Sequence, residues 1–400
     1  MKEYEQIIRK CEENSRISKR IVDEYLIYYA AARNNLESRM IREFDAYRHI
    51  TKQLKIEWLN MMKSQFIAHE IFKEEGLIGP YLNHAELKRI NKEERKYLEF
   101  QFAHPWRFSF SIVKENPEKD LYLMEDVFDS EEFLLFSPGI TTTLQEQAVI
   151  LWFNLIGYNG SCYQSYGPIG AYKSFEPDDI FFFATELNPD ISDEDDLLSD
   201  IKNNPIPYMM LISGANYPLV ANKNDQIVHV LAEYDMENMD TGSMKDSFIT
   251  EYNRGVYRLS LNKWNEHPHF SQAYFDETNK SVLISSMTDR GFKALVNGLN
   301  KYGYDFSDEP LVRVNLTMLR TASEILRRNI DLLKYEKLFS KLSTPEEKEK
   351  LDKLNLLLEY LILDINAGRE PDIASLASKA GVDIEVAKNL VSQIMKKYRK

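Results

Sequence analysis

The sequence YNGSCYQSYGPIG, at residues 158–170, contains three glycines and one proline among three tyrosines. Closely spaced glycine and proline interrupt a helix, and glycine next to aromatic residues is typical of the tight bends in a small curled sheet or barrel. The chain before it has short runs in which apolar residues recur at every second position, and this pattern predicts strands. These strands are expected at residues 107–113, 121–124, 132–136 and 149–153. Residues 105–206 are therefore predicted to form a β-rich small sheet or barrel.

The chain on the N-terminal side of this segment, residues 1–104, is predicted to be a helical arm. It has no proline or glycine between Lys2 and Glu75, and its apolar residues recur at intervals of three, four or seven. Asn34–Asn35 is the expected break between two long antiparallel helices, which would form a helical hairpin. A third helix is expected at residues 83–102, before His104 and Pro105.

The chain on the C-terminal side changes character twice. Residues 207–309 are predicted to form an α+β unit with one helix at about 288–301. Its strands are expected at 208–212, 226–232, 255–261, 270–275 and 281–285. Residues 310–400 are predicted to be helical, with helices at 318–339 and at about 344–366. We therefore expect an α+β fold with an N-terminal helical arm, a central body of two small, mostly antiparallel sheet units and a helical C-terminus.

The last thirty residues, 371–400, have the pattern of a helix-turn-helix-like segment. Asp372 and Asp383 can cap two short helices, and Gly381 permits the left-handed turn between them. The exposed face of the second helix would contact DNA through Lys388, Asn389, Gln393, Lys396 and Lys397. No arginine, the residue that most often contacts guanine, lies on that face. A small helical cap or a protein-docking module explains the same pattern, and both interpretations stay open.

The charge of the chain is concentrated in its centre. Residues 105–309 contain 14 Lys and Arg against 33 Asp and Glu, and the whole chain carries −13. An acidic body repels phosphate backbones, so DNA is a partner only through the C-terminus.

Three groups of residues suggest chemistry in the acidic body. His267 and His269 would point to one side of an extended segment, as in some metal sites. Asp178–Asp179 and Glu125–Asp126 are adjacent carboxylates of the kind used in acid/base catalysis. Structural roles explain all three groups equally well. No phosphate-binding glycine loop or nucleophile motif is present, so we expect no cofactor.

The aromatic residues around the opening segment could line a ligand groove. Trp152, Tyr158, Tyr163 and Tyr166 would form it, with sheet packing as the alternative. The two cysteines, Cys11 and Cys162, have unlike sequence neighbourhoods and suggest no disulfide framework.

The expected location and partners follow from what the sequence contains. The first ten residues are charged, without the apolar core of a signal peptide, and the apolar runs are too short to cross a bilayer, so we expect a cytoplasmic protein without membrane contact. The aromatic stripes of the N-terminal helices favour a homo-oligomer, or else packing on the body. The protein partner is unknown. The leading hypothesis is a non-catalytic intracellular interaction or adaptor protein. The alternatives are a DNA-associated regulator and a hydrolase with its site in the acidic body.

Overall fold

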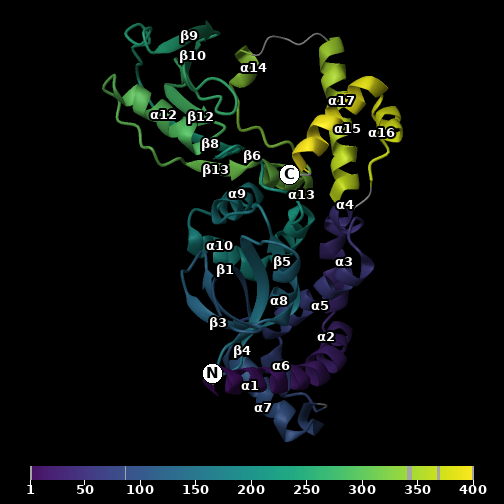
Figure 1. Ribbon diagram of the computed structural model, residues 1–400. Helices are drawn as coiled ribbons and strands as arrows, with labels where there is room; N and C mark the ends of the chain where they lie inside the picture. The colour runs from purple at the N-terminus through teal and green to yellow at the C-terminus, as the bar shows by residue number, and fades with distance from the viewer. Residues whose placement is uncertain (1, 86, 340–344, 367–369, 399–400) are drawn as a thin grey trace. The chain divides into compact units, whose positions relative to one another are not determined.

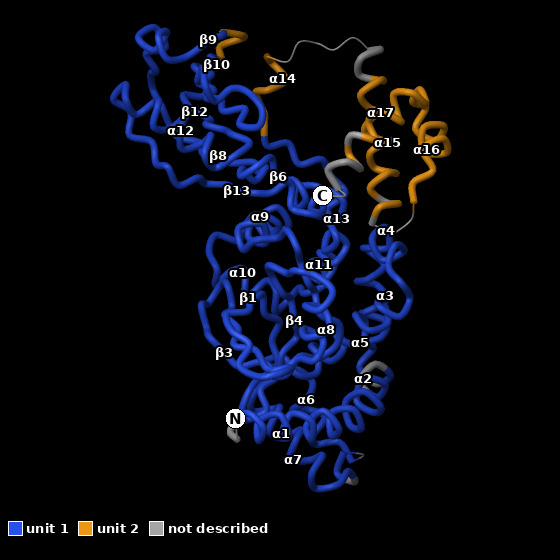
Figure 2. Tube along the Cα trace, in the orientation of Figure 1, with its two compact units in different colours: residues 1–251, 257–332 blue, residues 252–256, 333–400 orange. Residues whose placement is uncertain are grey.

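The computed structural model describes residues 2–85, 87–339, 345–366 and 370–398. The chain divides into two compact units (Figure 2). Unit 1 contains residues 1–251 and 257–332, and unit 2 contains residues 252–256 and 333–400. Figure 1 shows the elements of both units, with most of the strands in unit 1 and a group of helices in unit 2. The predicted α+β fold is confirmed.

The helical arm begins with α1 (Lys2–Ser18), a π-helical segment η1 (Lys19–Leu26) and α2 (Ile27–Arg33). The expected break at Asn34–Asn35 is present, because Asn35 adopts the left-handed conformation with φ of 51°. The prediction of a second long continuous helix is wrong. It is divided into α3 (Leu36–Ala46), α4 (Arg48–Thr51) and α5 (Ile56–Phe72). His49 on α4 contacts the carbonyl of Glu324 at 2.9 Å, and this long-range contact accompanies the interruption.

The arm ends with α6 (Ile78–Leu82), a 3-10 turn η2 (Leu87–Arg89) and α7 (Lys92–Ala103). Its apolar side chains share one hydrophobic core with the central body, where Phe66 and Ile71 of α5 are fully buried in the same cluster as Phe153. Ile50 is also buried, whereas Ile41, Ile56 and Met61 of the arm are exposed.

The segment after the arm is a closed five-stranded barrel, as the glycine-rich sequence predicted. Its strands follow the order β1-β2-β3-β5-β4, with β3 and β5 parallel. Helix α8 (Pro138–Glu146) lies between β3 and β4, and this topology is that of an OB-fold barrel. A fold does not define a ligand, so function depends on the side chains. The strands are β1 (Arg107–Glu118), β2 (Leu121–Asp126), β3 (Glu132–Phe136), β4 (Leu151–Tyr158) and β5 (Tyr163–Tyr172).

Two glycines show why this barrel needs its glycine-rich segment. Gly167 has φ of 75°, a conformation that favours glycine, and a Cβ there would lie 3.0 Å from Gln65 of α5. At Gly157 a Cβ would lie 2.5 Å from the Trp106 indole nitrogen. The arm and Trp106 therefore approach the barrel backbone so closely that a side chain at position 157 or 167 would collide with them.

Three helices follow the barrel: α9 (Pro177–Leu187), α10 (Glu194–Asn203) and α11 (Pro205–Met210). The predicted strand at 208–212 is wrong, since these residues lie in α11 and the 3-10 turn η3 (Leu211–Gly214). Pro205 starts α11, and all six of its residues are buried. A short apolar run that is buried on all sides has no periodicity to separate helix from strand.

The second sheet has six strands in the order β13-β8-β12-β11-β10-β9, with α12 (Asp289–Asn300) packed on β12 and β8. Thr288 caps α12 by accepting a hydrogen bond from the Gly291 N–H. A short hairpin, β6 (Ala221–Asn222) and β7 (Asp225–Gln226), precedes the sheet. The strands are β8 (Val228–Asp235), β9 (Phe248–Asn253), β10 (Val256–Leu261), β11 (Gln272–Asp276), β12 (Ser281–Ser286) and β13 (Val312–Asn315).

Helix α13 (Leu316–Leu326) follows β13 directly and is shorter than predicted. The predicted helix at 318–339 is wrong beyond Leu326, because Arg327 adopts a left-handed conformation with φ of 54°. The Arg327 guanidinium donates to His49 at 2.9 Å and that of Arg328 to the Glu186 carbonyl at 2.8 Å. These contacts hold the chain where a continuous helix would point both side chains elsewhere.

Unit 2 contains α14 (Glu336–Phe339), α15 (Pro345–Asn366), α16 (Ile373–Ala380) and α17 (Ile384–Tyr398). Asp372 caps α16, Gly381 has φ of 66°, and Val382 packs on the core between α16 and α17. The core residues are Leu357, Leu361, Leu376, Ala377, Ala380, Ala387 and Val391. Thr344, where the predicted helix at about 344–366 begins, lies outside the described residues. Among the helices of the described ranges, none has the length and apolar content to span a membrane.

Candidate functional site

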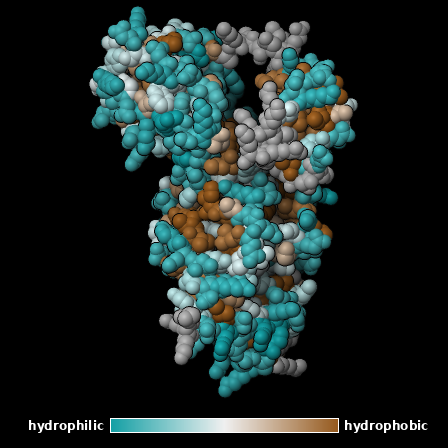
Figure 3. All heavy atoms as spheres, in the orientation of Figure 1, coloured by the Kyte–Doolittle hydropathy of each residue, from teal (hydrophilic) through white to brown (hydrophobic). Residues whose placement is uncertain are grey.

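A groove of about 700 Å³ runs along α9 in unit 1. It is formed by the β2–β3 turn, α9, the start of α10, α12 and the chain that leads into β13. Figure 3 shows apolar surface around α9 and α10, with hydrophilic side chains beside it. The lining residues are Val127, Phe128, Pro177, Asp178, Phe181, Phe182, Thr185, Glu194, Asp289, Lys293, Asp308, Glu309, Pro310, Leu311, Val312 and Arg313.

Helix α9, which forms one wall of the groove, is fixed at its N-terminus by a capping box. The main-chain N–H of Glu176 donates to the Asp179 carboxyl at 2.8 Å, and Pro177 occupies the first turn. The other oxygen of Asp179 accepts the Asn315 main-chain N–H at 2.8 Å. Asp179 thereby joins α9 to the end of β13, and it is completely buried.

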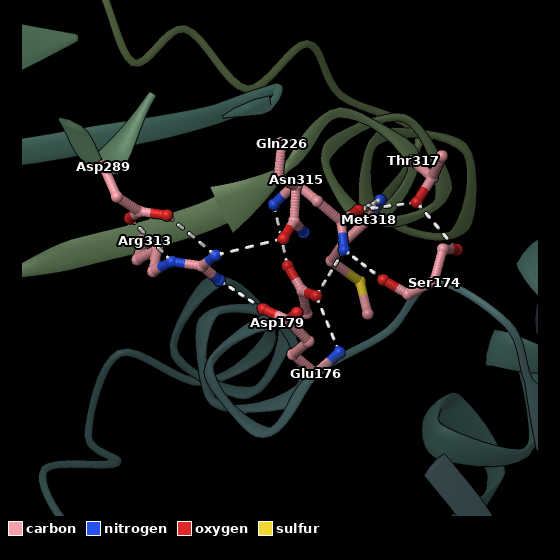
Figure 4. Close-up of polar contacts among 9 residues, drawn as sticks. All are labelled: Ser174, Glu176, Asp179, Gln226, Asp289, Arg313, Asn315, Thr317 and Met318. Carbon is pink, nitrogen blue, oxygen red and sulfur yellow. Dashed lines mark hydrogen bonds and ion pairs between the residues drawn. The ribbon is translucent and has the colours of Figure 1, made fainter. Parts of the chain in front are cut away.

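Asn315 lies at the centre of the polar contacts beneath the groove (Figure 4). Its side-chain amide donates to the Asp179 carboxyl and to the Ser174 carbonyl, the latter at 2.5 Å. Its side-chain oxygen accepts the Met318 N–H at 2.7 Å, which caps α13, and the Thr317 hydroxyl at 2.5 Å. A single side chain therefore connects α9, β13 and α13.

Arg313 lies at the edge of the groove and is held by two carboxylates (Figure 4). Its guanidinium binds Asp289 with two hydrogen bonds of 2.9 and 3.1 Å, and it also contacts Glu176. A longer bond of 3.4 Å reaches the Gln226 side-chain oxygen. Such a bidentate pair fixes orientation as well as charge. Arg313 therefore links α9 to α12 and is neutralised by acids of the same chain.

Burial shifts the pKa of several groups around the groove. Burial raises the pKa of Asp179 to about 7, although N–H donors from Asn315 and Glu176 oppose the rise. The groove walls shield the Asp178 carboxyl only in part, and this partial burial also raises its pKa, with Arg313 opposing the rise. For Arg313, burial disfavours the charged form, but the hydrogen bonds and charges of Asp289 and Glu176 outweigh it and raise the pKa.

The groove combines an apolar floor with an acidic rim. Phe181 and Phe128 are half-buried, and Leu311 is 70% exposed. The groove is lined by five carboxylates and two cations. The carboxylates are those of Asp178, Glu194, Asp289, Asp308 and Glu309, and the cations are Lys293 and Arg313, of which Arg313 is already paired. The net charge of the lining residues is negative, so the groove would attract cationic groups.

The adjacent carboxylates singled out in the sequence have structural contacts. Asp179 holds the joint described above, while its neighbour Asp178 is exposed at the groove. In the other pair, Glu125 binds Lys114 at 2.5 Å. Asp126 is completely buried and accepts from Arg107 at 2.9 Å and from Ser109 at 2.7 Å. Each buried carboxyl is therefore occupied by donors of the fold.

The four aromatic residues proposed for a ligand face lie in different surroundings. Trp152 is 1% exposed in the barrel core. Tyr163 packs against Phe133 at 5.2 Å between ring centroids. Tyr158 and Tyr166 line a polar cavity of about 230 Å³ between α1, α7 and the barrel. The structure thus brings two of the four residues to one cavity.

His267 and His269 are each held by a different partner. The His269 ring is buried and contacts the Thr288 hydroxyl at 2.7 Å. The His267 ring contacts the Asn222 amide at 3.0 Å. Over the described ranges, no group of three or more His, Cys, Asp and Glu side chains is arranged to hold a metal ion. The two histidines supply at most a pair of ligands there.

The residues proposed to contact DNA lie on α17 of unit 2. Lys388 and Asn389 are exposed, and Lys388 is paired with Glu385 at 2.8 Å. The side chains of Gln393, Lys396 and Lys397 lie outside what the structure describes. Ile384 and Val386, at the start of α17, are 41% and 40% exposed.

Sequence reasoning missed Arg313, Asn315 and Asp289, which complete the polar joint. Asn315 had a usable signal, since an asparagine three residues before Met318 matches an N-cap. The pairing of Arg313 with Asp289 has no comparable signal. Comparison of this chain with protein-family models, curated proteins and solved structures finds no match.

Proposed function

We propose that this protein binds another polypeptide, and that the groove along α9 accepts a positively charged segment with apolar side chains. The observation that carries this proposal is the combination of an apolar floor and a carboxylate rim in one groove of about 700 Å³. This is the interaction role expected from the acidic body, now assigned to particular residues.

The apolar floor supplies the affinity in this proposal. Phe128, Phe181 and Leu311 expose carbon surface that a leucine or phenylalanine side chain would remove from water. Burial of one such side chain contributes about 1.5–3 kcal/mol. A solvent-exposed groove with an apolar floor can accept side chains from an extended or a helical segment.

The acidic rim supplies the selectivity. Asp308 and Glu309 are exposed beside Leu311, and Asp178 faces the same groove. Arg313 cannot cancel their charge, because Asp289 and Glu176 already bind it. A lysine or arginine in the partner would meet unpaired carboxylates, whereas an acidic segment would be repelled.

Three labelled peptides of eight residues test this proposal on the full chain. The first alternates lysine and leucine, the second glutamate and leucine, and the third lysine and serine. Fluorescence anisotropy should show binding of the lysine–leucine peptide, with the other two at least about tenfold weaker. Equal binding of all three peptides, or none at all, would overturn the proposal.

Variants locate the binding on the molecule. Asp308→Asn with Glu309→Gln should weaken the lysine–leucine peptide by about 2–10-fold, and Leu311→Ala by about 5–10-fold. The matched control is Glu115→Gln with Glu132→Gln, which removes two exposed carboxylates from barrel strands β1 and β3. An equal effect in the control would assign the binding to overall charge.

A second candidate function, DNA association through α16 and α17 of unit 2, has one feature in its favour and one against it. The left-handed Gly381 between two capped helices supports it. The start of α17 opposes it, because Asp383 and Glu385 precede Lys388 and repel phosphate. Anisotropy of a labelled DNA duplex with the full chain at low salt tests this candidate. We expect no binding, and salt-dependent binding would favour the regulator.

A hydrolase in the acidic body has less support. The buried carboxyls of Asp179 and Asp126 each accept several hydrogen bonds from the fold. An acid or base of this kind needs an open position for a substrate proton.

A further inference from the structure

The only two cysteines of the chain, Cys11 and Cys162, lie in contact although 151 residues separate them. Cys11 is on α1, and Cys162 is in the β4–β5 turn of the barrel. Their Sγ atoms are 3.2 Å apart. Both residues are buried, with 0% and 2% of their surface exposed. The contact is one of the points at which the arm meets the barrel.

The residues around the two sulfur atoms hold them from both sides. The Asn159 amide donates to the Cys11 Sγ at 3.2 Å, and its oxygen accepts the Cys162 N–H at 3.0 Å. Gln164 donates to the Cys11 carbonyl at 2.9 Å. Lys10 on α1 donates to the Ser161 hydroxyl at 3.0 Å. The helix and the turn are therefore positioned independently of any bond between the sulfur atoms.

We propose that Cys11 and Cys162 are a redox-sensitive pair that hydrogen peroxide converts into an intramolecular disulfide, which ties α1 to the barrel. The sulfur atoms need to approach by only about 1 Å to reach the ordinary disulfide bond length of about 2.05 Å. In a reducing compartment such a bond forms transiently and acts as a sensor.

The reaction has two steps. The Cys11 thiolate attacks one oxygen of hydrogen peroxide, the O–O bond breaks, and Cys11 becomes a sulfenic acid as hydroxide leaves. The Cys162 sulfur then attacks the Cys11 sulfur. The S–S bond forms, the S–O bond breaks, and the oxygen leaves as water with the Cys162 proton. Two thiols are oxidised by two electrons, and one peroxide is reduced to two waters.

The surroundings of the two thiols indicate which one reacts first. The hydrogen bond from Cys162 lowers the pKa of Cys11 against the effect of burial, with help from Asn159 and the charge of Lys10. The same contact and burial raise the pKa of Cys162. The Asn159 amide also lies closer to the Cys11 Sγ, at 3.2 Å, than to the Cys162 Sγ, at 3.6 Å. The thiolate is the nucleophilic form, so this contact and the two pKa directions favour Cys11 as the attacking residue.

A cavity lies beside the residues that contact the two sulfur atoms. Asn159 and Gln164 line the polar cavity of about 230 Å³ that also contains Ser15. A cavity of this size admits peroxide and water to the residues that contact the sulfur atoms. Because both cysteines are buried, a small molecule such as peroxide suits the site better than a peptide thiol or its disulfide.

The test uses the full chain in its reduced form. After treatment with hydrogen peroxide, the protein is denatured and labelled with a polyethylene-glycol maleimide. We expect two labels before oxidation and none after it, a decrease in intact mass equal to two hydrogen atoms, and full reversal by dithiothreitol. The melting temperature of unit 1, measured by tryptophan fluorescence, should rise by about 5–10 °C on oxidation.

Two variants separate this reaction from other oxidations. Cys162→Ser should stop at the Cys11 sulfenic acid, which dimedone traps, whereas Cys11→Ser should react at least about tenfold more slowly. Circular dichroism checks that each variant is folded. The proposal would be overturned if peroxide oxidised the two thiols of the denatured chain but left those of the native chain reduced under the same conditions. Disulfides that join two chains, or faster reaction of Cys11→Ser, would also overturn it.

Discussion

Two buried asparagines, Asn315 and Asn159, hold different parts of unit 1 together. The Asn315 side chain makes four hydrogen bonds and that of Asn159 makes five, and the two residues are 2% and 6% exposed. Asn315 binds a carboxyl, that of Asp179, and joins α9 to β13 and α13. Asn159 binds the Cys11 thiol and joins the β4–β5 turn to α1. The comparison teaches that the partner of the asparagine sets the chemistry of each joint, a carboxyl with a raised pKa in one and the thiol pair of the redox proposal in the other.

Asn315→Ala should have the largest effect. It removes one donor from the buried Asp179 carboxyl, which keeps two main-chain N–H donors, and it takes the side-chain partner from the Ser174 carbonyl and the Met318 N–H. We expect the free energy of unfolding of unit 1 to fall by about 3–5 kcal/mol at pH 7. Urea unfolding followed by tryptophan fluorescence measures it, because all four tryptophans, Trp58, Trp106, Trp152 and Trp264, lie in unit 1.

The control for this variant is Asn116→Ala. Asn116 also donates two side-chain hydrogen bonds to main-chain carbonyls, but it is exposed. Its loss should cost at most about 1 kcal/mol. Equal losses in the two variants would mean that the α9 joint contributes no more than an exposed turn.

The second prediction concerns the pH dependence of the Asp179 joint. The folded state holds the Asp179 proton up to about pH 7, whereas the unfolded chain releases it near 3.8. The folded state therefore binds more protons in this range, and stability from this group is lost as pH rises from about 4 to 7. The Asp179→Asn variant has no carboxyl at this position, so it should not lose this stability as pH rises.

The unfolding free energies of wild type and Asp179→Asn, measured from pH 4 to 7, test this sign. The wild-type free energy minus that of the variant should fall by about 2–4 kcal/mol as pH rises. A difference that is constant, or that grows, would show that the N–H donors on Asp179 outweigh its burial.

The third prediction addresses the thiol joint. Asn159→Ala removes two donors to weak or neutral acceptors, Cys11 and Gln164, and the cap of the β4–β5 turn. Because sulfur accepts weakly, we expect a loss of about 1–3 kcal/mol, below that of Asn315→Ala. Urea unfolding of the reduced protein measures it. Asn203→Ala, at an exposed residue with one main-chain contact, is the control. A loss above that of Asn315→Ala would reverse the comparison.

The smallest effect is expected for Tyr166→Phe, at the edge of the thiol joint. The Tyr166 hydroxyl donates to Asp23 at 2.5 Å, and Asp23 is exposed. The ring keeps its contact with Trp106, whose centroid is 5.1 Å away. Only one hydrogen bond near solvent is lost, so the unfolding free energy should fall by about 0.5–1 kcal/mol in the same urea assay. A loss above about 2 kcal/mol would mean that this contact helps to dock α1.

Much of the fold could be predicted from the sequence where the signals are local. The glycines of residues 158–170 predicted the curled sheet, and Asn34–Asn35, Asp372 and Gly381 occupy the expected turn and cap positions. Caps and left-handed turns depend on a residue and its nearest neighbours, so one sequence contains the information. The barrel order and the addition of β13 to the second sheet depend on distant pairings.

The errors in the prediction occur where packing overrides local preference. Residues 205–214 are apolar in a run and became helix because they are buried on every side. The helix after Met318 ends at Leu326, where Arg327 and Arg328 bind residues of α4 and α9. Neither outcome has a periodic signal within its own segment.

The sequence by itself determined most of the element types, the acidic centre and the residues able to carry charge or redox chemistry. Only the tertiary structure decided which of them meet. Asp179 and Asn315 are 136 residues apart, and Cys11 and Cys162 are 151 apart. Helix and turn preferences act over a few residues, whereas these contacts form only when packing of the shared core brings distant segments together.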